Sequence, residues 1–187
     1  MGRHGDGKMN LVLIGYRGSG KSVVGRRLAD HLQMTFVDTD DLIEERQGIP
    51  IADIVKSRGW GHFRKLENKV IEEISKEDHL IIAPGGGAVL DTDNVKALRK
   101  RGTVIWLQAD RQTLLKRMNQ DPGTNTRRPS LTGKGTKGTS EELKEIMSFR
   151  EPIYEKASEI QIDTSTLDVD TVVEQILTAL KNKVGRI

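Results

Sequence analysis

Hydrophobic and polar positions alternate along the chain in two patterns. Short runs of consecutive apolar residues are typical of strands buried on both faces. Between these runs, apolar residues recur every three or four positions, which indicates helices with one buried face. The strand-like runs lie at residues 10–14, 35–37, 79–83, 103–107 and 159–162. The helix-like stretches lie at residues 24–32, 42–57, 66–74, 91–101, 114–118 and 169–180, and Gly48 and Pro50 divide the second of them into two pieces.

This alternation predicts an α/β fold. Strands separated by helices of this length form βαβ units and a parallel sheet. We therefore expect a three-layer, doubly wound sheet of about five parallel strands flanked by helices. A chain of 187 residues is the size of one domain. We place that domain at residues 9–182, with residues 1–8 as a flexible N-terminal extension and residues 183–187 as a C-terminal tail.

One segment, residues 119–140, breaks the pattern. It holds four glycines, two prolines and a single large apolar residue, Leu131. A loop of this length inside a compact domain is either a functional lid or a floppy connector, and composition alone leaves both open.

Composition excludes several classes of protein. The chain has no cysteine, which rules out disulfides, thiol catalysis and cysteine-bound metals, and its four histidines are scattered. No apolar run is long enough to span a membrane, and the polar start of the chain is unlike a secretory signal. Aromatic residues make up 4% of the chain, too few for a base-stacking surface. We expect a cytoplasmic, monomeric protein without a membrane or nucleic-acid partner.

The clearest motif is a phosphate-binding loop. Residues 15–22 read G-Y-R-G-S-G-K-S, which matches G-x-x-x-x-G-K-[ST] at every fixed position. In such a loop, backbone N–H groups and the following helix N-terminus face phosphate oxygens. Lys21 would reach the β- and γ-phosphates, and Ser22 would bind Mg²⁺. The expected nucleotide contacts are Gly18, Ser19, Gly20, Lys21, Ser22 and Val23.

The rest of the chain favours a kinase of a small metabolite. A guanine-reading Asn-Lys-x-Asp is missing, because neither Asn68-Lys69 nor Asn182-Lys183 is followed by Asp two positions on. A lid over the phosphates would exclude water and so prevent ATP hydrolysis. Two alternatives stay open: a gluconate or nucleoside monophosphate kinase, and a non-catalytic nucleotide-binding module whose basic lid contacts RNA.

Several further residues could have either a binding or catalytic role or a purely structural one. Asp38 and Asp40 follow the second strand, where one could hold Mg²⁺ through water and the other a substrate hydroxyl, or either could cap the next helix. Arg64 and Glu67 lie three positions apart and so share a helix face, where they could belong to a site or form only a surface ion pair. Residues 85–87 (G-G-G) would let a ligand approach the backbone, or form a plain turn. Arginines in the lid and at position 150 suit an anionic substrate.

Together these motifs resemble the shikimate kinase family. That family has a phosphate loop, Asp-x-Asp, Phe-Arg-x-x-Glu, a triple glycine, Arg-Pro in a lid, and a later Arg shortly before a Pro-x-Tyr segment. The resemblance covers about residues 9–182. The motifs stand here, in the same order, at residues 15–22, 38–40, 63–67, 85–87, 128–129 and 150–154.

The resemblance implies ATP-dependent phosphorylation of the 3-hydroxyl of shikimate, with Mg²⁺ as cofactor, on the route to chorismate and aromatic amino acids. The implied catalytic residues are Lys21, Asp40 and Arg128. The implied metal ligands are Ser22 and, through water, Asp38. The implied nucleotide contacts beyond the loop are Arg117, Arg128, Asp163 and Thr164. The implied substrate contacts are Asp40, Arg64, Glu67, Gly85, Gly86, Gly87 and Arg150.

Two positions depart from the family pattern. Trp60 stands after Gly59 where many members have Glu, and Ser130 follows the lid Arg-Pro where Leu is frequent. These departures lead us to expect a thinner apolar wall in the substrate pocket.

Overall fold

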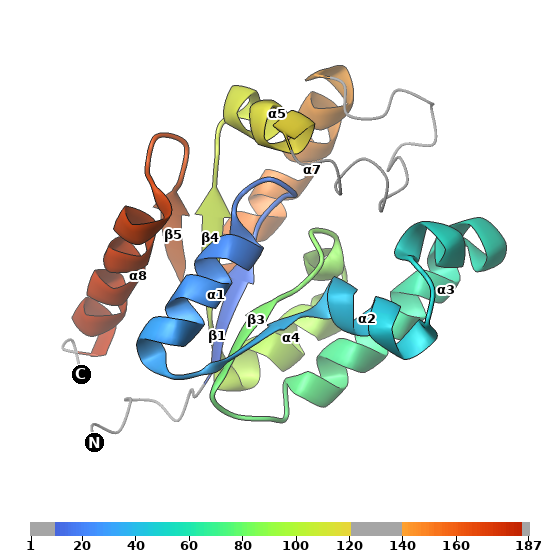
Figure 1. Ribbon diagram of the computed structural model, residues 1–187, viewed down its shortest axis with the longest axis horizontal. Coiled ribbons are helices and arrows are strands. Elements are labelled where there is room, and N and C mark those ends of the chain that lie inside the picture. Colours follow the sequence, from blue (N-terminus) through green and yellow to red (C-terminus); the bar gives the residue numbers. More distant parts are fainter. Residues whose placement is uncertain (1–9, 121–139, 185–187) are drawn as a thin grey trace.

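The computed structural model of the protein describes residues 10–120 and 140–184 (Figure 1). Five strands form one sheet in the order β2-β3-β1-β4-β5, and every pair of neighbours is parallel. This confirms the expected α/β class. Most of the expected lid, the N-terminal extension and the end of the C-terminal tail lie outside the described residues. The strands are β1 (Asn10–Ile14), β2 (Thr35–Asp38), β3 (Leu80–Ala83), β4 (Gly102–Gln108) and β5 (Ile160–Asp163).

Helices cover both faces of the sheet (Figure 1). α1 and α8 pack together on one face, whereas α3, α4 and α7 cover the other. A short 3₁₀ turn, η2 (Ala88–Leu90), follows β3. The helices are α1 (Lys21–Leu32), α2 (Thr39–Gln47), α3 (Ile51–Ile74), α4 (Thr92–Arg101), α5 (Arg111–Gln120), α7 (Ser140–Ala157) and α8 (Val169–Val184).

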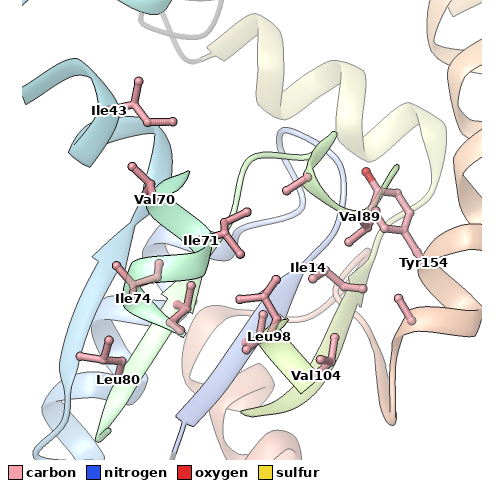
Figure 2. Packing of buried hydrophobic residues seen from close by; sticks show 14 of the residues in the cluster. Ile14, Ile43, Val70, Ile71, Ile74, Leu80, Val89, Leu98, Val104 and Tyr154 are labelled. Carbon is pink, nitrogen blue, oxygen red and sulfur yellow. The ribbon is translucent and has the colours of Figure 1, made fainter. Parts of the chain in front are cut away.

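The central strand β1 is buried along its whole length because helices cover both faces. Its side chains alternate between two apolar clusters. Leu11 and Leu13 belong to the cluster with α1 and α8, whereas Val12 and Ile14 belong to the cluster with α3 and α4. Figure 2 shows this second cluster, in which Ile14 lies near Leu98 and the Tyr154 side chain enters from α7.

The predicted elements are confirmed with small shifts at their ends, and one helix differs. The predicted break at Gly48 and Pro50 is present, and Gly48 ends α2 with a φ of 69°. By contrast, the stretches expected at 51–57 and 66–74 join into α3. Its only non-helical residue is Gly59, with φ 78° and ψ 167°. Because only the backbone of Gly59 departs from helical angles, the helix resumes at once and carries Trp60 toward the pocket described below.

The topology brings three loops to one edge of the sheet. In a parallel sheet all carboxyl ends face the same edge, and the connections on either side of the central strand leave a crevice there. β1 lies between β3 and β4, so the loop after β1 is flanked by the segments that follow these two strands, and the segment after β2 lies one strand further along. No described helix is long and apolar enough to cross a membrane.

Candidate active site

The loop after β1 has the backbone geometry that its glycines allow. Gly15 has a φ of 145°, and a Cβ on it would lie 2.6 Å from the carbonyl oxygen of Leu107. Any other residue would therefore clash with β4. The loop then leads directly into α1, which begins at Lys21, so the helix N-terminus and the loop N–H groups lie together.

Lys21 and Ser22 connect this loop to its surroundings. The Lys21 Nζ donates hydrogen bonds to the carbonyl oxygens of Gly15 (2.8 Å) and Tyr16 (3.1 Å). Ser22 Oγ donates to Asp38 Oδ2 at 2.9 Å. Asp38 Oδ1 also accepts from the backbone N–H of Asp40 at 3.0 Å, which caps α2. Asp38 therefore serves both the cap and the loop.

A cavity of about 600 Å³ lies over the phosphate loop. The acidic side chains of Asp38 and Asp40 line it near Lys21, and Leu167 and Val169 line it near α8. Val23, 56% exposed, belongs to its wall. The cavity thus combines a phosphate cradle, oxygen ligands and an apolar flank, which suits a nucleoside triphosphate with its metal.

Arg117 and Thr164 join the loop to α5 and β5. Arg117 Nη1 donates to the Gly18 oxygen (3.3 Å) and to Thr164 Oγ1 (3.0 Å), and its Nη2 donates to the Thr164 oxygen at 2.6 Å. Both residues line the large cavity. Asp163 does not: it is exposed, and its Oδ1 accepts from Ser165 N at 2.8 Å. The structure therefore brings two of these three residues to the nucleotide cavity.

A second pocket adjoins the first and shares Arg17, Asp40 and Ile51 with it. Six further residues of its lining come from α3, from the turn after β3 and from α7. They are the expected substrate residues Arg64, Glu67, Gly85, Gly86, Gly87 and Arg150.

Arg64 and Glu67 form a buried ion pair in this pocket. Arg64 Nη1 donates to Glu67 Oε2 at 2.5 Å, and the Glu67 side chain is 1% exposed, so this is not a surface ion pair. Burial raises the pKa of Glu67 to about 7, although the Arg64 charge opposes this shift.

Arg150 enters the same pocket from α7 and is 7% exposed. Its Nη1 donates to the Gly86 oxygen at 3.2 Å, and the Tyr154 hydroxyl donates to the same oxygen at 2.6 Å. Burial raises the pKa of Tyr154 to about 12, so its hydroxyl keeps its proton. A Cβ on Gly87 would lie 2.4 Å from Arg64 Nη2. Both arginines thus reach the glycine turn.

Two aromatic residues of α3, Trp60 and Phe63, also line the pocket. The ring of Trp60 lies edge-on to Phe63, with centroids 5.8 Å apart. The Arg64 guanidinium carbon lies 5.5 Å from the Trp60 ring centroid and 5.3 Å from that of Phe63. On this side the wall is aromatic, which corrects the expectation that Trp60 would thin it. The i, i+4 spacing of Arg150 and Tyr154 on one helix was the available signal for Tyr154. Arg128 and Ser130 lie outside the described residues.

This arrangement defines the class of the protein. A phosphate loop after the central strand, with a polar acceptor pocket beside it, is the plan of a phosphate-loop kinase that acts on a small molecule. The sequence model of the family described as shikimate kinase matches residues 17–181. The chain belongs to the shikimate kinase family.

Relatives and solved structures agree with this assignment. The chain is 40% identical to a shikimate kinase of Syntrophus aciditrophicus over 90% of this chain and 89% of that one. It is 41% identical to one of Symbiobacterium thermophilum, over 94% and 98%. A solved shikimate kinase from Acinetobacter baumannii, in complex with shikimate, has a TM-score of 0.85 at 30% identity and covers 93% of each chain. A gluconokinase from Sinorhizobium meliloti, at 17% identity and a TM-score of 0.57, shares the fold.

Proposed function

We propose that this protein transfers the γ-phosphoryl group of ATP to the 3-hydroxyl of shikimate. The bond from Pγ to the bridging oxygen of ADP breaks, a new bond forms from Pγ to the 3-oxygen, and the proton of the hydroxyl is released to solvent. The products are shikimate 3-phosphate and ADP, on the route to chorismate and aromatic amino acids. One observation carries the proposal: a pocket with two arginines opens beside the phosphate loop and shares Asp40 with the nucleotide cavity.

In the nucleotide cavity, Lys21 supplies the positive charge nearest the transferring group. Its ammonium lies among loop carbonyls, within reach of the cavity that the loop lines. Gly18, Ser19, Gly20 and Val23 frame the phosphates, and Arg117 and Thr164 flank the adenine end. Asp163 would act there only through the turn that it holds with Ser165. Arg128, outside the described residues, is proposed as the lid arginine that neutralises charge during transfer.

The donor set at Ser22 and Asp38 suits Mg²⁺. A hydroxyl and a carboxylate 2.9 Å apart are hard oxygen ligands that this ion prefers, with Asp38 acting through water. In the described parts of the chain, no group of three or more histidine or acidic side chains could hold a metal alone. Mg²⁺ held by Ser22 and, through water, by Asp38 would neutralise negative charge on the nucleotide phosphates.

In the second pocket, Arg64 and Arg150 hold the substrate carboxylate. Glu67 fixes Arg64 by accepting its hydrogen bond, and the backbone of Gly85, Gly86 and Gly87 approaches the ring hydroxyls. Asp40 lies where the two cavities join, so it accepts the hydrogen bond of the attacking hydroxyl and aims its oxygen at the γ-phosphate. A cytoplasmic location and a monomeric state remain predictions.

ADP release measured with and without shikimate tests this function. Gluconate, AMP and CMP test the alternative kinases, and the methyl ester of shikimate tests whether the carboxylate charge is read. We expect turnover with shikimate to exceed that with every other compound by orders of magnitude. Equal turnover with gluconate, or ADP release that does not depend on shikimate, would overturn the proposal. Salt-sensitive RNA binding without ADP release would favour the RNA-binding alternative.

A further inference from the structure

One side-chain oxygen of the buried Glu67 takes no part in the contact with Arg64. Oε2 accepts the hydrogen bond from Arg64, whereas Oε1 is buried and has no hydrogen-bond partner among the residues that the structure describes. Buried polar atoms are nearly always paired, because an unpaired one loses its hydration without compensation. The second oxygen therefore needs an explanation beyond holding Arg64.

Asp40 approaches the same side of Gly85 as that oxygen. A Cβ on Gly85 would lie 2.8 Å from Glu67 Oε1 and 2.7 Å from Asp40 Oδ1. Both oxygens, which come from two different helices, thus lie close to the place that a side chain at position 85 would occupy, which is possible only because this residue is glycine. Two ionised carboxylates in such a position repel each other, whereas one proton between them would let one donate to the other.

The charges around Glu67 come from three elements. Arg64 on α3 and Arg150 on α7 favour its ionised form, and Asp40 on α2 favours its protonated form. The turn at residues 85–87 brings no charge. Burial is the largest influence on Glu67 and also favours the protonated form, so its pKa lies at about 7. At neutral pH, a small change in the surrounding charge therefore decides whether the proton stays.

We propose that Glu67 works in its protonated form, donating a hydrogen bond from Oε1 to Asp40 while Oε2 still accepts from Arg64. Glu67 is then a positioning residue, because it holds one oxygen of Asp40 and leaves the other for the acceptor hydroxyl. The inference rests on the proposed function in one respect. An acid bound to Arg64 and Arg150 adds negative charge beside Glu67, so acid binding and retention of the proton strengthen each other.

This linkage has a measurable consequence. If only the protonated form binds the acid, the KM for shikimate rises by up to about tenfold per pH unit above neutrality. The KM for ATP does not follow, since the nucleotide cavity contains no atom of Glu67.

The test compares Glu67→Gln with wild type across a pH series. Glutamine resembles the protonated acid, because its amide can donate to Asp40 and its carbonyl can accept from Arg64. We expect the alkaline rise in the KM for shikimate to disappear in this variant, whatever its absolute rate. Glu72→Gln is the matched control: Glu72 lies on the same helix, is 70% exposed and pairs with Lys76, so its variant must keep the rise.

An alkaline rise that persists in Glu67→Gln, or is missing from wild type, would overturn the inference. A purely structural role would lower the melting temperature of Glu67→Gln without altering the shape of the pH profile. Infrared difference spectra provide a readout without turnover: a protonated-carboxyl band lost on raising the pH in wild type must be missing in Glu67→Gln. If shikimate causes no ADP release at all, the proposed function fails, while this band still decides the protonation of Glu67.

Discussion

Arg64 and Arg150 reach the same glycine turn from two different helices, α3 and α7. A Cβ on Gly87 would lie 2.4 Å from Arg64 Nη2, and Arg150 Nη1 donates to the Gly86 oxygen at 3.2 Å. Two guanidinium groups lining one cavity can bind a carboxylate through several charge-assisted hydrogen bonds. This pairing distinguishes the pocket from a general nucleotide site.

Replacing Arg64 by Ala should mainly weaken binding of the acid. Loss of a charge-assisted hydrogen bond costs about 1.5–3 kcal/mol, which corresponds to a roughly 10- to 100-fold rise in the KM for shikimate. The KM for ATP should change little, and steady-state kinetics with each substrate varied separately measure both. Arg58→Ala is the control, because Arg58 is exposed on the same helix. Unchanged shikimate affinity in Arg64→Ala would remove this assignment of the pocket.

Lys21→Met should lower kcat rather than substrate affinity alone. The ammonium lies in the phosphate loop, where it can stabilise charge that develops during transfer, and removal of one such group costs about 10²- to 10³-fold in rate. Single-turnover measurements would separate this chemical step from product release. A variant that unfolds at the wild-type temperature yet keeps its kcat would contradict the role.

Trp60 should contribute modestly to the position of Arg64. Its ring lies 5.5 Å from the guanidinium carbon, and a cation–π contact at a partly exposed site contributes about 0.5–1 kcal/mol. Trp60→Ala should therefore raise the KM for shikimate about two- to fivefold, and Trp60→Phe should recover part of the loss. Identical KM values in the Ala variant and wild type would show that the contact with Phe63 alone is enough to position Arg64.

Arg117→Ala should weaken nucleotide binding, because Arg117 joins the phosphate loop to the Thr164 segment through three hydrogen bonds. We expect the KM for ATP to rise about tenfold while the KM for shikimate stays within about twofold. Arg111→Ala, at an exposed position on the same helix, serves as the control. A larger rise in the KM for shikimate than in the KM for ATP would contradict a role of Arg117 in nucleotide binding.

Glu67 should also make stability depend on pH. Its pKa is about 7 in the folded protein against an ordinary value of 4.5. Between these two values the folded state binds more protons than the unfolded state, so the free energy of unfolding falls as pH rises, by about 3 kcal/mol in all. Urea denaturation at the two ends of this window should show a smaller fall for Glu67→Gln than for wild type. Equal falls in both proteins would show that Glu67 titrates normally.

Much of the fold and part of the site could be predicted from the sequence because they depend on neighbouring residues. The phosphate loop is contiguous, and its glycines, Lys21 and Ser22 act through adjacent backbone groups. Strand and helix periodicity located nearly every element. The joining of two expected helices across Gly59 was missed because a glycine with a positive φ interrupts the periodicity without ending the helix.

The amino-acid sequence by itself determined which chemical groups are available: the loop for phosphates, the Arg64–Glu67 spacing on one helix and the triple glycine. Only the tertiary structure decided how these groups affect one another. It inserted β3 between β1 and β2, placed Trp60 against Arg64, and buried Glu67 opposite Asp40. The physical reason is that burial and the approach of distant charges arise from packing between elements, whereas backbone conformation and helix-face spacing are local.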